Sequence, residues 1–166
     1  MPENISLEVT AEDLANSKIG NQEYNAIKSE EKNATISLKS NADTTSCKYN
    51  IIYKTEYNYF ENKYTTSSGT LNDLKNQLVL NINGYTYNNG QKQSVSYSYD
   101  LVDIKESDKI LAENMVITDI QDNTTTNIDW KISLTFNNYK NYNQNNNAGK
   151  KARGKISVQM LECERT

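Results

Sequence analysis

Two alternating runs joined by Asn89-Gly90 constrain the fold of this chain more than any other feature. The runs cover residues 78–87 and 92–101. Asn-Gly favours a type I′ turn, because both central residues of that turn have a positive φ. The resulting hairpin pairs the apolar residues of one face with one another: Leu78 with Leu101, Leu80 with Tyr99, Ile82 with Tyr97, and Gly84 with Val95.

The same register gathers polar residues on the opposite face of the hairpin. That face carries Asn81 with Ser98, Asn83 with Ser96, Tyr85 with Ser94, and Tyr87 with Lys92. A slip of one residue would mix the two faces, so turn chemistry and hydrophobic pattern agree on a single register. We therefore predict that Tyr97 and Tyr99 point into the core, together with Trp130 from a later strand.

Alternation of apolar and polar residues recurs along the rest of the chain and predicts further strands. Their ranges are 5–9, 33–39, 47–57, 110–120, 127–138 and 155–163. Residues 10–20 are the one candidate for a short helix, and residues 21–32 read as a polar connector. About eight strands and at most one helix near the N-terminus predict an all-β protein.

The expected architecture is an antiparallel β-sandwich of Ig-like or jelly-roll type, and the sequence does not choose between these two. A length of 166 residues predicts a single domain over 1–166, with its core in roughly 33–163. The mean hydropathy of −0.83 leaves few apolar residues for that core. Alternating strands suit this composition, because half of each strand stays polar.

Charge and hydropathy exclude two classes of partner. The net charge of −3 gives no basic surface for nucleic acid, so no nucleic-acid partner is expected. No run of eighteen apolar residues occurs, so no membrane span is predicted. Lys150, Lys151, Arg153 and Lys155 form a short basic cluster. We interpret it as charges that keep a strand edge soluble, with binding of anionic polymers as the alternative.

The two cysteines, Cys47 and Cys163, stand at the ends of two predicted strands. We favour a disulfide between them over two free thiols, because an even count in a Tyr- and Asn-rich β protein is typical of secreted domains. A bridge would close a long loop and contribute roughly 2–4 kcal/mol. This interpretation predicts an extracellular or cell-surface location.

The chain contains no histidine, which removes the commonest general base and most zinc ligand sets. The carboxylates show no pairing typical of catalysis, and no metal or other cofactor is expected. Tyr85 and Tyr87 offer a different chemistry, because aromatic rings beside amides and hydroxyls suit sugar binding. The alternative role for these two tyrosines is ordinary half-buried strand packing.

Four segments carry a family resemblance. They are Asn-Ala-Thr-Ile-Ser-Leu from Asn33, Thr-Ser-Cys-Lys-Tyr-Asn-Ile from Thr45, Trp-Lys-Ile-Ser-Leu-Thr-Phe-Asn-Asn-Tyr from Trp130, and Ala-Gly-Lys with Gly-Lys-Ile-Ser-Val after Ala148. Together they resemble secreted β-sandwich proteins of low-GC Gram-positive bacteria, similar to camelysin and the biofilm-fibre surface proteins. The resemblance implies an extracellular, non-enzymatic role and carries over no functional residues.

The sequence thus predicts a secreted or cell-surface structural or adhesive domain without catalytic activity. The strands Ile5–Val9 and Ile110–Ile120 are expected at sheet edges, where they could self-associate by strand addition. Cell-surface glycans are the other expected partner. The alternative function is a carbohydrate-binding module that uses Tyr85 and Tyr87.

Overall fold

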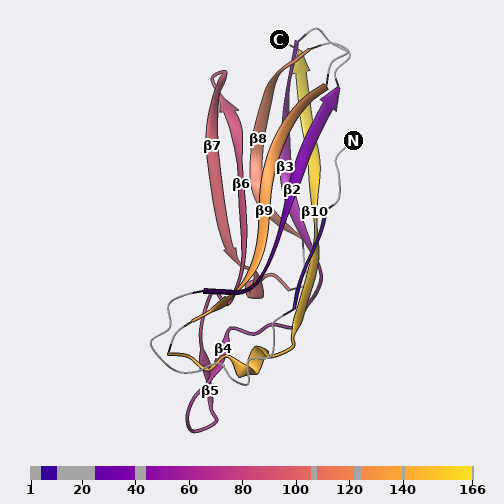
Figure 1. Cartoon of the computed structure of the whole chain (residues 1–166). Helices are drawn as coiled ribbons and strands as arrows, with labels where there is room; N and C mark the ends of the chain where they lie inside the picture. The colour runs from indigo at the N-terminus through magenta and orange to yellow at the C-terminus, as the bar shows by residue number, and fades with distance from the viewer. Residues whose placement is uncertain are drawn as a thin grey trace.

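The computed structural model describes residues 5–10, 25–39, 44–105, 108–121, 125–139 and 141–165. Two four-stranded antiparallel sheets face each other, and a two-stranded sheet lies at one end (Figure 1). The strands are β1 (Ile5–Thr10), β2 (Asn25–Lys39), β3 (Thr44–Asn58), β4 (Lys63–Thr65), β5 (Leu71–Asp73), β6 (Leu78–Asn88), β7 (Gln91–Asp100), β8 (Lys109–Gln121), β9 (Thr125–Asn138) and β10 (Lys151–Arg165). Two 3-10 helices, η1 (Leu101–Asp103) and η2 (Asn145–Asn147), complete the described elements. The predicted all-β sandwich of about eight strands is confirmed.

The order of the strands decides between the two predicted topologies. One sheet has the order β1-β10-β3-β8 and the other β2-β9-β6-β7. The pairs are nested: β6 pairs with β7, β3 with β8, β2 with β9, and β1 with β10. The chain therefore follows a long hairpin that is wound into two sheets, which is the jelly-roll arrangement.

The innermost hairpin has the predicted register. Leu80 pairs with Tyr99 and Gly84 pairs with Val95, as the alternation requires. Asn89 and Gly90 have φ values of 52° and 75°, as a type I′ turn demands. The ladder ends at Val79 and Asp100, one pair earlier than predicted, because η1 begins at the next residue.

Strand β2 corrects the prediction for residues 21–32. It begins at Asn25, so most of the expected connector belongs to a strand. Residues 25–32 are mostly polar and show no hydrophobic alternation that would predict a strand. Pairing of β2 along nearly the whole of β9 determines the extended conformation of these residues instead. The predicted helix over residues 10–20 lies outside the described residues, apart from Thr10, which ends β1. The short β4–β5 hairpin was not predicted.

Both predicted edge strands are edges. β1 and β8 occupy the two ends of the β1-β10-β3-β8 sheet. Strand β10, however, lies between β1 and β3, so the basic cluster at its start does not protect an edge. Its cations lie beside carboxylates instead: Lys150 pairs with Glu61, and Arg153 and Lys155 both pair with Glu56. The prediction that this cluster keeps an edge soluble is wrong.

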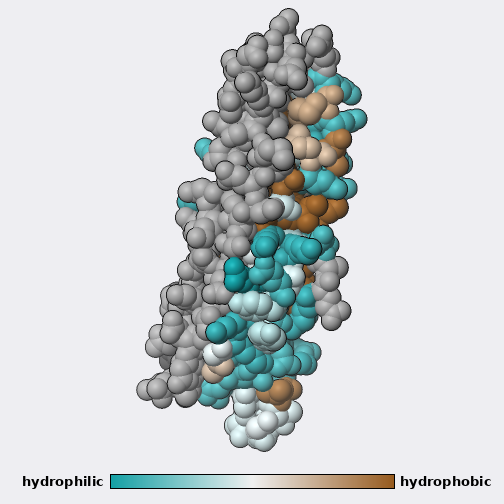
Figure 2. Space-filling model, turned by 90° about the vertical axis from the view of Figure 1, so that its right-hand side faces the viewer, coloured by the Kyte–Doolittle hydropathy of each residue, from teal (hydrophilic) through white to brown (hydrophobic). Residues whose placement is uncertain are grey.

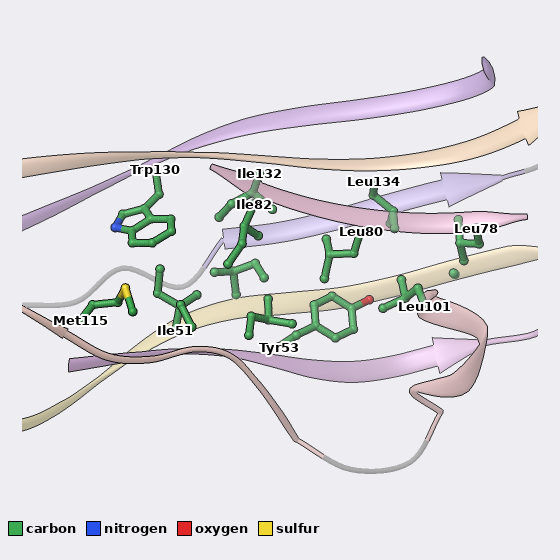
Figure 3. Close-up of a cluster of buried hydrophobic side chains, with 14 of the residues drawn as sticks. Ile51, Tyr53, Leu78, Leu80, Ile82, Leu101, Met115, Trp130, Ile132 and Leu134 are labelled. Atoms are coloured by element: carbon green, nitrogen blue, oxygen red, sulfur yellow. The ribbon is translucent and has the colours of Figure 1, made fainter. Parts of the chain in front are cut away.

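The core lies between the inner faces of the two sheets (Figure 3). Alternate residues of β3, β6 and β9 supply most of it, which is the pattern expected of a sandwich. The largest fully buried side chains are Trp130, Tyr49, Tyr53, Phe60, Phe136, Ile51, Leu78, Leu80, Ile82 and Leu101. The predicted core position of Trp130 is confirmed. Tyr97 and Tyr99 are only half-buried and pack against the margin of the core, which corrects their prediction.

Two contacts determine the position of Trp130, one with the opposite sheet and one within its own sheet. The indole Nε1 donates a hydrogen bond of 3.0 Å to the Tyr49 hydroxyl, which belongs to the opposite sheet. Burial raises the pKa of Tyr49 to about 12, so this hydroxyl stays protonated at neutral pH. The Trp130 ring also covers Gly84 of the neighbouring strand, where a Cβ atom would lie 2.3 Å from ring carbon. Gly84 therefore provides the space that the indole occupies.

We expect Gly84→Ala to destabilise the protein by about 1–3 kcal/mol, because the added methyl group overlaps the Trp130 ring. Urea unfolding followed by the fluorescence of Trp130, the one tryptophan in the chain, measures the change. Ser94→Ala, on an exposed position of β7, is the control and should stay within about 0.5 kcal/mol of the wild type. An unchanged midpoint for Gly84→Ala would refute the packing argument.

Candidate binding surfaces

Tyr85 and Tyr87 lie on the outer face of the β6–β7 hairpin, near its tip. Both rings are half-buried, and both pack against the margin of the core. Their centroids are 6.0 Å apart and their planes meet at 80°. Because the rings are nearly perpendicular, they do not form one flat platform for two successive sugar rings.

Lys92 occupies one face of the Tyr85 ring. Its ammonium nitrogen lies 3.8 Å from the ring centroid, a cation–π distance. Burial, followed by the Tyr87 hydroxyl and the Asp129 carboxylate, raises the pKa of Tyr85. Tyr85 therefore has a structural role within the hairpin, and Tyr87 is the ring of this pair that is better placed to stack on a ligand.

Tyr97 and Tyr99, which the alternation assigned to the core, line the open side of the sandwich instead. The Tyr99 hydroxyl donates a 2.5 Å hydrogen bond to the carbonyl oxygen of Leu111, so this ring spans from β7 to β8. Burial and the neighbouring Tyr97 hydroxyl raise the pKa of Tyr99. The position of Tyr99 is thus determined from both sheets.

Two adjoining cavities form a groove between β7 and β8, which we call the β7–β8 groove. Their volumes are about 330 and 670 Å³. Both cavities are lined by Tyr99 and Lys109, so they meet at these residues. The remaining lining residues are Tyr97, Ser98, Asp100, Asp103, Ile104, Asp108, Ile110, Leu111 and Glu113.

The charge of the β7–β8 groove is predominantly negative. Four carboxylates line it against one ammonium group, that of Lys109. Asp100 is committed to the fold, because it accepts hydrogen bonds from the Asn62 amide and from the backbone of Asn76 and Val102. Asp103 lies 3.5 Å from the Lys75 ammonium group. Asp108 and Glu113 are exposed and form no ion pair with any of the described residues.

A buried network of amide side chains organises the end of the sandwich that carries β4 and β5. Gln77 is fully buried, and its Nε2 donates to the carbonyl oxygens of Glu61, Lys63 and Leu74. Its Oε1 accepts hydrogen bonds from the side chains of Gln144 and Asn147, which are also fully buried. This network stabilises the segments that flank the β4–β5 hairpin and the loop that contains η2, and the sequence pattern did not indicate it.

Polarity also differs along the outer surface. On the side that Figure 2 shows, hydrophilic residues cover most of the lower half of the described surface, whereas hydrophobic residues gather in the upper half. Among the described residues, four large hydrophobic side chains are strongly exposed: Tyr59, Leu71, Ile110 and Leu161. Of these, Ile110 also lines the β7–β8 groove.

The predicted disulfide is present. Cys47 on β3 and Cys163 on β10 are direct partners across the ladder, and their Cα atoms are 4.0 Å apart. The bridge joins residues 116 positions apart, on the two inner strands of the β1-β10-β3-β8 sheet. Within the described residues, no group of three or more His, Cys, Asp or Glu side chains could hold a metal ion. That part of the chain also has no helix long and apolar enough to cross a membrane.

The strand order defines the protein as a jelly-roll β-sandwich. No protein-family model matches the chain, and a search of curated proteins gives no match. One solved structure with a related backbone is that of infectious bursal disease virus, Gt strain, with a TM-score of 0.32 and 10% identity over 95% of this chain and 30% of that chain. Another is the VP2 subviral particle of the same virus, with a TM-score of 0.29 and 11% identity over 97% and 33%. The chain spans about a third of these viral chains, and at such TM-scores they carry no argument about function.

We expect Gln77→Ala to destabilise the protein by about 1–3 kcal/mol, because each of its buried amide and carbonyl partners loses a hydrogen bond. Hydrogen exchange should become faster in residues 60–76 and 139–150 than in the two large sheets. Gln93→Ala, on the exposed surface of β7, is the matched control and should change neither quantity. Equal protection in Gln77→Ala and the wild type would show that the network does not stabilise these loops.

Proposed function

We propose that this protein is a secreted or cell-surface structural or adhesive domain without catalytic activity. The observation that carries the proposal is the Cys47–Cys163 disulfide. Disulfides form and persist in oxidising compartments and are rare in the cytosol, which supports an extracellular location. By linking β10 to β3, the bridge also keeps these two neighbouring strands of one sheet from separating, which suits a domain that bears load or contacts surfaces.

The edge strands support an adhesive role. β7 is the longest edge strand whose ladder has no register shift, with ten residues paired regularly to β6. β8, in contrast, has three register shifts against β3, and Asn114 within it has a φ of 54°. Such bulges disfavour the addition of a further strand. Of these two edges, β7 is therefore the better site for association with another polypeptide.

The test of the proposed location is the intact mass of the protein isolated from its native source, before and after reduction. We expect the oxidised mass to be lower than the reduced mass by two hydrogens, and the Cys47–Cys163 peptide pair to be recovered after digestion without reduction. Rapid alkylation during lysis prevents disulfide formation after the cells are opened. Two freely alkylated thiols in the native protein would overturn the extracellular proposal.

Carbohydrate binding at the hairpin is the second candidate function. It is favoured by the partial exposure of Tyr87 on a polar face, where Asn83 and Ser96 present an amide and a hydroxyl. Rings of this kind stack on sugar faces while amides bind hydroxyl groups. Because Lys92 covers Tyr85, the main contribution is assigned to Tyr87.

We expect Tyr87→Ala to abolish binding on an array of bacterial and host glycans, and Tyr85→Ala to weaken it less. Tyr59→Ala is the matched control, because Tyr59 is 62% exposed and lies outside the hairpin. The fluorescence of Trp130 verifies that each variant is folded. No glycan bound by the wild type, or retention unaffected by Tyr87→Ala, would dismiss this candidate.

A further inference from the structure

The outer edge of β7 presents backbone groups that pair with none of the described strands. In a hairpin with a two-residue loop, Asn88 and Gln91 form a hydrogen-bonded pair, and the pattern then alternates along the ladder. Every second residue of β7 therefore turns its N–H and C=O away from β6. These residues are Lys92, Ser94, Ser96, Ser98 and Asp100. Figure 1 shows β7 at the outer margin of its sheet, with no described strand beyond it.

The β7–β8 groove lies beside this edge. Tyr97 and Tyr99 alternate with Ser96 and Ser98, so they project from the face of β7 that borders the groove. A strand added to β7 would place every second side chain on that same face, about 5 Å from its cross-strand neighbour. Those side chains would contact the two tyrosine rings and Ile110. Backbone pairing and side-chain pockets thus occur together, as in β-strand addition.

The charge of the β7–β8 groove determines which kind of added strand it favours. The groove carries four carboxylates against one ammonium group, and Asp108 and Glu113 form no ion pair with described residues. A segment with Lys or Arg side chains would complement these carboxylates. A second copy of β7 would instead bring two acidic grooves together. The charge therefore favours a basic partner over pairing between two copies at this edge.

We propose that β7 binds an extended, Lys- or Arg-bearing segment of another polypeptide as an added strand, with its basic side chains in the β7–β8 groove. This inference rests on the adhesive role proposed above and names the class of partner for that role. Ser96 provides the outward N–H near the centre of the contact. Tyr97 and Tyr99 provide the ring surfaces, and Asp108 and Glu113 provide the charge.

The experiment measures binding of a ten-residue Lys-Val repeat peptide, equal in length to β7, by fluorescence anisotropy. A Glu-Val repeat peptide is the charge control. We expect Ser96→Pro to weaken binding at least about tenfold, because proline removes the outward N–H and leaves the β6 ladder intact. Ser96→Ala, which loses only the hydroxyl bonded to Asn83, should bind like the wild type.

A second variant, Asp108→Asn combined with Glu113→Gln, tests the contribution of the two carboxylates. This double variant should weaken binding about three- to tenfold and reduce its dependence on salt. It keeps the proposal falsifiable if Ser96→Pro does not fold, which Trp130 fluorescence reveals. Failure of the wild type to bind the Lys-Val peptide overturns the proposal. So does equal affinity for the Glu-Val peptide, binding undiminished in folded Ser96→Pro, or binding undiminished in the double variant.

This experiment is independent of the test of location. Peptide binding by a protein whose native form has free thiols would uphold the groove and overturn the extracellular proposal. An oxidised native protein that does not bind the Lys-Val peptide would leave the extracellular proposal standing and overturn the groove. Association of the wild type with itself, abolished by Ser96→Pro without any peptide binding, would show that β7 pairs two copies and would also overturn the proposed partner.

Discussion

The antiparallel pairing of β6 with β7 is the interaction on which the rest of the structure depends. Its two-residue turn determines the register, and the register determines which side chains face the core. Each later pairing is nested around this hairpin, from β3 with β8 to β1 with β10. A slip at the turn would therefore expose Leu80 and Ile82, and the strands wound around the hairpin would lose the apolar surface against which they pack.

In this nested arrangement the outer strand pairs join residues that are distant in sequence. The turn of the β6–β7 hairpin does not bring these strands together, so other interactions must stabilise their contacts. Three of the connections among the described residues join elements that are especially distant in sequence. The disulfide joins β3 to β10, the Trp130–Tyr49 hydrogen bond joins the two sheets, and the network around Gln77 joins the loops at one end. All three act between residues more than sixty positions apart, where closure of the chain has its largest entropic cost.

Structural features that depend on neighbouring residues in the sequence were predictable. Features that depend on contacts with residues far away in the sequence were not. The hairpin register follows from Asn89-Gly90 and the flanking alternation, and the edge position of β8 agrees with its irregular pattern. The start of β2 depends on its partner β9, so its own polar residues do not reveal it. The partners of Gln77 are likewise brought together only by the fold. The alternation assigned Tyr97 and Tyr99 to the correct face, but it does not show that the sandwich is open beside them.

The two edge strands that border the β7–β8 groove, β7 and β8, differ in the regularity of their pairing. β8 is interrupted by bulges, one of which is stabilised where the Asn114 N–H donates to the Asn50 side chain. β7 has no bulge and no proline, although a regular edge of ten residues invites uncontrolled pairing. In the proposal above, the acidic groove beside β7 disfavours a second copy, because two such grooves would repel each other. The same charge would attract a basic segment to the backbone groups of β7, which is how repulsion can make a regular edge selective.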